Sequence, residues 1–248
     1  FFYLLLISNM NNTILLIYIV ILTSITFMQT SLSTARPGSG NDVNSLNPLS
    51  LQIESGMSNS NTIFNHNHLI RLGILPFFEF HSSYSQNLSR EMDLIGYNLM
   101  TGLSINPDYN NNNSNINYAI ITDAVFPQEI DAKWLEHTTF VLYVPISTNY
   151  YQNLFFQFTG DYMAGRETYQ FKPMLTLSVS GNIDPKSNWF AEIYTLSEQG
   201  YLNYPILAGG ATYLINNNFQ LDISIGTALY EDGNNRFIDC GLSYRLID

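Results

Sequence analysis

The chain has 248 residues, and 12% of them are Asp, Glu, Lys or Arg, about half the share of roughly 25% that soluble domains carry. With so few charged side chains, the chain is poorly suited to a surface that contacts water on all sides. The net charge of −11 excludes nucleic acid as a ligand and disfavours anionic lipid surfaces. This length fits one large all-β domain, and the 17 Tyr and 16 Phe fit the aromatic belts of membrane proteins.

The first 35 residues contain no Asp, Glu, Lys or Arg, and they include an apolar run from Ile14 to Ile25. This run has the length of a signal-peptide core and is too short to span a membrane as a helix. Ser33 and Ala35 occupy the small-residue positions of a cleavage site. We therefore predict a cleavable signal peptide over residues 1–35, starting at Met10, with an uncleaved anchor helix as the alternative. An N-terminal lead-in (36–48) and a barrel (49–248) follow.

Beyond the lead-in, short alternating segments are separated by clusters of Asn, Asp, Gly, Pro and Ser. The segment FQLDISIG (219–226) alternates without interruption, as a strand with two different faces does. We predict twelve strands, at residues 49–57, 67–75, 77–85, 92–103, 116–125, 138–147, 152–161, 171–180, 187–196, 206–215, 219–230 and 236–246. An even number of strands with lengths near ten residues is typical of a closed, antiparallel transmembrane β-barrel.

Connection lengths give a second test, because bacterial barrels alternate short periplasmic turns with longer outer loops. The links after the second, sixth, eighth and tenth strands are short, and those after the odd-numbered strands are mostly longer. The fourth link, residues 104–115, breaks this rule with a poly-Asn tract. It is either a tolerated insertion or a sign of mispaired strands there.

In the predicted strands the charged residues fall on the face opposite the apolar one. A charge that faces hydrocarbon costs roughly 2 to 4 kcal/mol at mid-bilayer, so this face should enclose the lumen. The predicted lumen-facing residues are Glu54, Arg71, Glu79, His81, Glu192, Asp222, Asp239 and Arg245. The two arginines could pair with Glu54, Glu79, Glu192 or Asp239 on neighbouring strands. Such charges either brace the lumen or form a constriction that selects solutes.

Several patterns occur in a fixed order: LSLQIESGM, LIRLGILPFFEF, NWFAEIYTL, ILAGGATYLINNNFQLDISIGTAL and the terminal CGLSYRL. This order resembles the bacterial outer-membrane family described as transporters of the meta-pathway of phenol degradation, from about Leu49 to Leu246. The resemblance implies an outer-membrane β-barrel that moves small, often aromatic, compounds. The charged positions of the family motifs match Glu54, Arg71, Glu79, Glu192 and Arg245.

The sequence contains no G-x-S-x-G, no Gly-rich phosphate loop and no H-E-x-x-H. His66 and His68 fall in a predicted Asn-rich loop and make a weak metal site, so we predict no enzyme, no cofactor and no metal. We expect a passive or weakly selective pore for small solutes, with aromatic or hydrophobic ones as a candidate class. Inward Phe190 and Tyr194 could line its path.

The expected partners are outer-membrane lipid, small solutes and the barrel-assembly machinery, after export to the bacterial outer membrane. Two other readings fit the same alternation. One is a non-conducting structural or surface-recognition barrel, and the other is a soluble secreted β-sandwich whose polar face meets water.

Overall fold

The computed structural model describes residues 32, 34, 42–60, 63–89, 94–106, 116–126, 138–148, 154–163, 174–198, 201–229 and 236–247. The strands in these ranges are β1 (Leu51–Ser60), β2 (Ile63–Leu75), β3 (Phe78–Ser89), β4 (Leu94–Ile105), β5 (Ile116–Tyr118), β6 (Ile120–Phe126), β7 (Thr139–Thr148), β8 (Leu154–Met163), β9 (Met174–Asn182), β10 (Ser187–Glu198), β11 (Tyr201–Asn216), β12 (Phe219–Ala228) and β13 (Arg236–Ile247). The predicted all-β class is confirmed. Within the described ranges no helix is long and apolar enough to cross a membrane.

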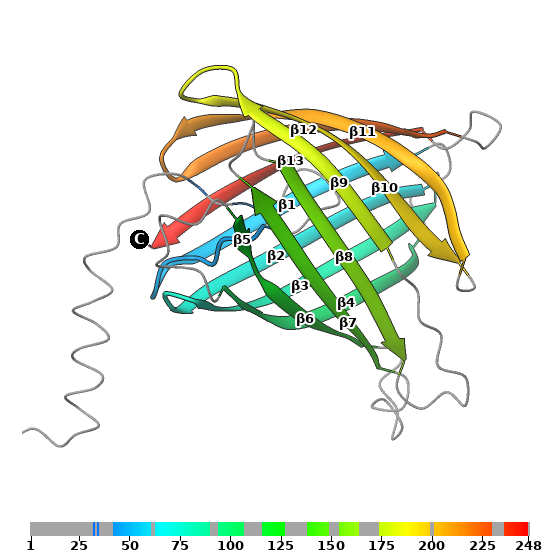
Figure 1. The fold of residues 1–248 in the computed structure, drawn as a ribbon, viewed down its shortest axis with the longest axis horizontal. Helices are drawn as coiled ribbons and strands as arrows, with labels where there is room; N and C mark the ends of the chain where they lie inside the picture. Colours follow the sequence, from blue (N-terminus) through cyan, green and yellow to red (C-terminus); the bar gives the residue numbers. More distant parts are fainter. Residues whose placement is uncertain are drawn as a thin grey trace, which may run out of the picture.

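The strands form one antiparallel sheet that closes on itself through the pairing of β13 with β1 (Figure 1). β5 and β6 are two parts of one interrupted strand, because the chain leaves the ladder at Ala119 and both parts pair with β7. The described circumference therefore has the twelve strands that the alternation predicts. Closure pairs the strand edges, which a sheet in hydrocarbon requires. The two stacked layers of a soluble sandwich are not the fold.

Two hairpins extend further than predicted. β2 begins at Ile63 and β11 at Tyr201, so most of the residues taken as long connections continue the ladder. Asn59 pairs with Phe64, and Glu198 pairs with Tyr201. Backbone hydrogen bonds can extend a hairpin beyond the apolar belt, where the side chains no longer need to alternate. Residues 107–115 of the poly-Asn link and, apart from residues 32 and 34, the predicted signal peptide lie outside the described residues.

Tight turns join the strands at the end of the barrel where β1 begins. They lie at residues 76–77, 183–186 and 217–218. These turns follow β2, β9 and β11, which are the second, eighth and tenth of the twelve predicted strands, where short links were predicted. Asp184 holds one of them, because its Oδ1 accepts hydrogen bonds from the backbone N–H groups of Lys186 (2.7 Å) and Ser187 (2.9 Å). The bond from Lys186 contributes most to keeping the pKa of Asp184 below its usual value. Short turns mark the periplasmic end of bacterial barrels.

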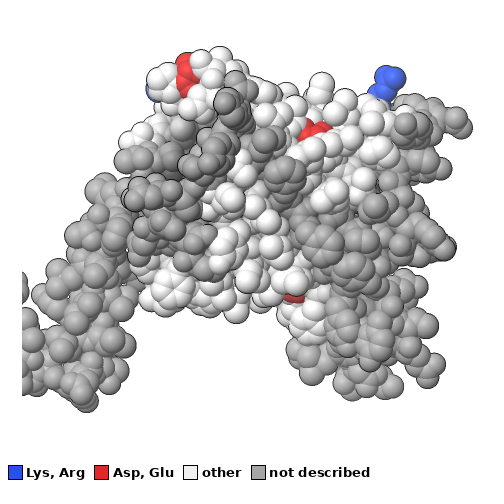
Figure 2. Space-filling view, viewed as in Figure 1, with Lys and Arg blue, Asp and Glu red and all other residues white. Residues whose placement is uncertain are grey.

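The two sides of the wall differ in polarity. The outer side exposes large apolar side chains, among them Ile70, Leu103, Leu142, Leu207 and Ile225. Figure 2 shows that the described outer surface, seen from this direction, carries few charged side chains. Buried positions are instead mostly polar, and they include Gln52, Glu54, Arg71, Thr176 and Ser243. This is the reverse of a soluble core and the arrangement of a barrel in lipid.

An outward lysine near mid-strand tests this assignment. Ile223 lies in the middle of β12 and is 49% exposed. We expect Ile223→Lys to lower the free energy of unfolding in lipid vesicles by about 2–4 kcal/mol, because the ammonium would enter hydrocarbon. Denaturant titration measures this loss. Ile183→Lys is the matched control, because Ile183 is exposed in the 183–186 turn, outside the strands. Equal stability of the two variants would contradict a lipid-facing β12.

Candidate functional site

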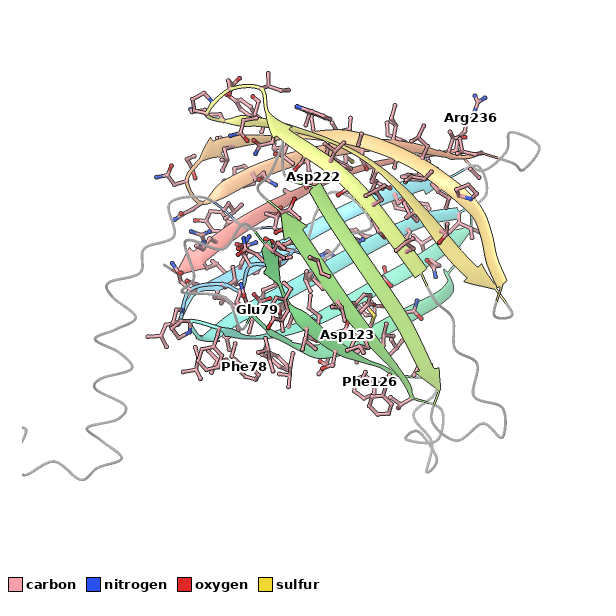
Figure 3. All side chains as sticks on the ribbon, viewed as in Figure 1. Phe78, Glu79, Asp123, Phe126, Asp222 and Arg236 are labelled. Carbon is pink, nitrogen blue, oxygen red and sulfur yellow. The ribbon has the colours of Figure 1, made fainter. Side chains whose placement is uncertain are left out.

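The inner side of the wall collects the charged residues that alternation placed there. Six of the predicted residues are buried, namely Glu54, Arg71, Glu79, Glu192, Asp222 and Arg245, and the other two, His81 and Asp239, are half-buried. In Figure 3, Glu79, Asp123 and Asp222 lie within the barrel, whereas Phe78 and Phe126 lie on its outer side. A role for these residues in selecting solutes remains a prediction.

A buried ion cluster joins the first three strands. Arg71 of β2 makes a bidentate contact with Glu79 of β3, with Nε 2.7 Å from Oε1 and Nη2 2.9 Å from Oε2. Its Nη1 lies 3.3 Å from Oε1 of Glu54 on β1, and Gln52 Nε2 donates to that same oxygen over 3.0 Å. Fork geometry of this kind is the strongest that arginine makes with a carboxylate. The cross-strand pairing predicted for Arg71 is therefore observed.

The end of the predicted lead-in lies against this cluster. We name residues 42–50 the inward segment, since Val43, Ser45, Leu46, Asn47 and Ser50 are all buried. Its backbone is held by wall side chains through three bonds. Arg71 Nη2 donates to the Asn44 carbonyl (3.2 Å), Asn106 Nδ2 donates to the Val43 carbonyl (2.9 Å), and the Leu46 N–H donates to Glu79 Oε2 (2.9 Å). The sequence analysis assigned no role to this segment.

A tight turn carries the chain from the inward segment into β1. The Ser50 N–H donates to the Asn47 carbonyl over 3.1 Å, which encloses Pro48 and Leu49. Leu49 has a φ of 66°, so the turn is of type II, with proline at its second position. Gly73 of β2 lets the segment approach, because a Cβ there would collide with the Asn47 carbonyl. Proline before the first strand was the sequence signal for this turn.

A second contact spans three strands on the same side of the lumen. His81 of β3 passes over Gly102 of β4, and its Nε2 lies 2.5 Å from Oδ1 of Asp123 on β6. Any side chain at position 102 would meet both partners, so glycine is needed there. The sequence analysis missed Asp123, although it alternates with the outward Ile120 and Thr122 and could have been found in that way.

β10, β12 and β13 carry the remaining acidic residues that were predicted to face the lumen. Glu192 on β10, Asp222 on β12 and Asp239 on β13 share the inner side, and Ser224 Oγ donates to Asp239 Oδ2 over 3.2 Å. Phe190 and Tyr194 are half-buried and lie two residues on either side of Glu192, so they share its side of β10. This side of the lumen therefore combines carboxylates with aromatic rings.

The ion cluster forms part of the lining of a cavity of about 310 Å³, at the lower end of the roughly 300–1,000 Å³ range of small-molecule pockets. Its lining comes from the inward segment and from β1, β2, β3, β4, β6 and β7. Most of the lining residues carry polar groups, among them Asp42, Asn65, His81, Ser83, Asp123 and Tyr143. The arrangement can hold a small hydrogen-bonding solute next to several carboxylates.

The histidine pair does not lie in a loop as predicted. His66 and His68 belong to β2, and their ring centroids are 4.2 Å apart. They alternate with Asn65, Asn67 and Leu69, so they share the side of Ile70 and Leu72, although His68 also contributes to the cavity lining. The loop prediction failed because this hairpin continues past the apolar part of the strand.

Comparison with known proteins gives a family match. The family model described as "Putative MetA-pathway of phenol degradation" matches residues 34–246. The chain belongs to this family. No curated protein matches the sequence.

Among solved structures the fold is similar to those of outer-membrane channels. The KdgM porin in complex with disordered oligogalacturonate has a TM-score of 0.58 at 11% identity, covering 78% of this chain and 98% of that one. The NanC porin has a TM-score of 0.57 at 12% identity, covering 79% and 100%. The COG4313 outer membrane channel from Pseudomonas putida F1 has a TM-score of 0.54 at 9% identity, covering 85% and 100%. These likenesses show that the chain has the fold of these channels, a closed antiparallel β-barrel.

Proposed function

We propose that this member of the family is a passive outer-membrane pore for small solutes, narrowed at its periplasmic end by the inward segment. The proposal includes export by the signal peptide, insertion by the barrel-assembly machinery, and no catalytic step. Its main support is the cavity of about 310 Å³, lined mostly by residues with polar groups, inside a wall whose outer side is apolar. Such a cavity lowers the cost of bringing a hydrated solute into the membrane.

Aromatic compounds are among the small solutes that this pore would pass. The rings of Phe190 and Tyr194 share the inner side with Glu192, and ring stacking would add to hydrogen bonding for a solute that carries both kinds of group. Most residues of the cavity lining carry hydrogen-bonding groups, which favours solutes with such groups over pure hydrocarbons.

Liposome swelling tests the pore. We expect vesicles that contain the folded barrel to swell in phenylalanine and in isoleucine, two zwitterions of similar size, and to swell faster in phenylalanine. Boiling-dependent gel mobility confirms folding in the same sample. Phe190→Ala should remove the phenylalanine advantage and leave the isoleucine rate unchanged.

The second candidate is a non-conducting structural barrel, which the burial of the inward segment favours. Folded protein that gives no swelling with either amino acid would support that candidate and refute the pore. Equal rates for the two solutes would refute only the aromatic preference.

A further inference from the structure

Acidic groups outnumber basic ones on the inner side of the wall. The carboxylates that the described strands place on this inner side are Glu54, Glu79, Asp123, Glu192, Asp222 and Asp239. The inward segment adds Asp42, which lines the cavity. Against these stand Arg71, Arg245 and the imidazole of His81. The described lumen therefore stays acidic whether or not His81 is protonated.

The basic groups are in poor positions to attract an anion. Arg71 is engaged by both oxygens of Glu79, by Glu54 and by the Asn44 carbonyl, so its cluster keeps a net negative charge. Arg245 is buried near the end of β13, opposite Gln52, and is not among the residues that line the cavity. His81 lies against Asp123. At Arg71 and at His81 an incoming anion would have to displace an existing carboxylate contact.

One acceptor in the lumen lacks a donor. Asp239 accepts from Ser224 through Oδ2, whereas its Oδ1 is buried and has no hydrogen-bond partner among the described residues. A buried carboxylate oxygen without a donor is costly, and an N–H group or a metal cation would satisfy it. This observation comes from β13, which does not line the cavity, and it also favours a cation.

We propose that the lumen selects small cationic solutes, such as alkali cations and primary ammonium compounds, over anions. This proposal rests on the proposed pore function. Rings of Asp and Glu select cations in channels, and low-dielectric walls focus the field of such charges on the passage. The lumen would then concentrate cations about tenfold, the lower end of the range for focused fields.

Reversal potential across a planar bilayer under a KCl gradient tests this selectivity. We expect the wild-type barrel to pass K⁺ in preference to Cl⁻ by about tenfold. Asp239→Asn and Asp42→Asn should each lower that ratio, because each removes one lumen charge at nearly constant volume. Asp184→Asn is the matched control, since it removes an equal charge from the exposed 183–186 turn and should leave the ratio unchanged.

Each outcome decides between the two proposals. A conducting wild-type barrel with no ion preference, or with a preference for Cl⁻, refutes the cation selectivity and leaves the pore intact. No current from a barrel that is folded by gel mobility refutes the pore and the selectivity together. Equal ratios for Asp239→Asn, Asp42→Asn and the wild type would also overturn the assignment of selectivity to these charges.

Discussion

Replacing Arg71 with methionine is expected to lower the free energy of unfolding by about 3–5 kcal/mol, the usual cost of removing one partner from a buried ion pair. Arg71 is 4% exposed, and it holds the carboxylates of Glu54 and Glu79, which are also buried. Without the guanidinium these two groups repel each other in the lumen. Denaturant titration of the folded barrel in detergent, followed by boiling-dependent gel mobility, measures the loss.

A variant that removes the whole charge group separates charge from packing. Arg71→Met combined with Glu54→Gln and Glu79→Gln should regain much of the stability, because no uncompensated charge stays buried. The free energy of unfolding of Arg71→Lys should lie between those of the wild type and Arg71→Met, because an ammonium group cannot make the bidentate contact. If Arg71→Met were as stable as the wild type, the cluster would not brace the wall.

Replacing Gly73 with alanine is expected to displace the inward segment and to increase the unitary conductance. The new Cβ would collide with the Asn47 carbonyl oxygen and would lie 2.9 Å from the carbonyl oxygen of Leu46. Overpacking of this kind costs about 1–3 kcal/mol if nothing moves. Moving the segment avoids that cost but gives up the Gly73 N–H to Ser50 bond of 3.0 Å and the Leu49 N–H to Gly73 bond of 2.8 Å.

Cysteine labelling reports the displacement directly. Ser45 is buried in the inward segment, so Ser45→Cys in a Cys240→Ser background should react slowly with a hydrophilic maleimide and faster once Gly73→Ala is added. Gly209→Ala is the matched control, because its Cβ would meet only the wall of β10, with the nearest atom at 3.1 Å. Unchanged labelling and conductance in Gly73→Ala would show that the segment does not limit the passage.

The strands were largely predictable because lipid imposes one rule along their whole length. In β12 every second residue from Phe219 faces outward, and Asp222 and Ser224 are buried as the alternation requires. The same rule placed Glu54, Arg71 and Glu79 on one side of three consecutive strands. Errors occurred at strand ends, as in β2 and β11, where the chain leaves hydrocarbon and the side chains no longer need to alternate.

The outward hydroxyl groups of Ser82 and Thr101 show how the alternation can fail locally. Both lie near mid-strand on the side that faces lipid, where a polar group without a partner is costly. Thr101 Oγ1 donates to Ser82 Oγ over 3.1 Å, and Ser82 Oγ donates to the Met100 carbonyl over 3.1 Å. Pattern analysis gives no access to such pairs, because each partner lies on a different strand.

The sequence by itself determined the number of strands and grouped the eight predicted charges on the side opposite the apolar residues, and its shortage of charge favoured lipid as the outer solvent. Period-two alternation and a shortage of charge are local properties of the chain, so they can be read before any contact is known. Only the tertiary structure decided that Arg71 binds Glu79 and Glu54, that His81 reaches Asp123 over Gly102, and that residues 42–50 lie inside the wall. These contacts depend on the register between strands and on space left by single glycines, and both are fixed only when the barrel closes.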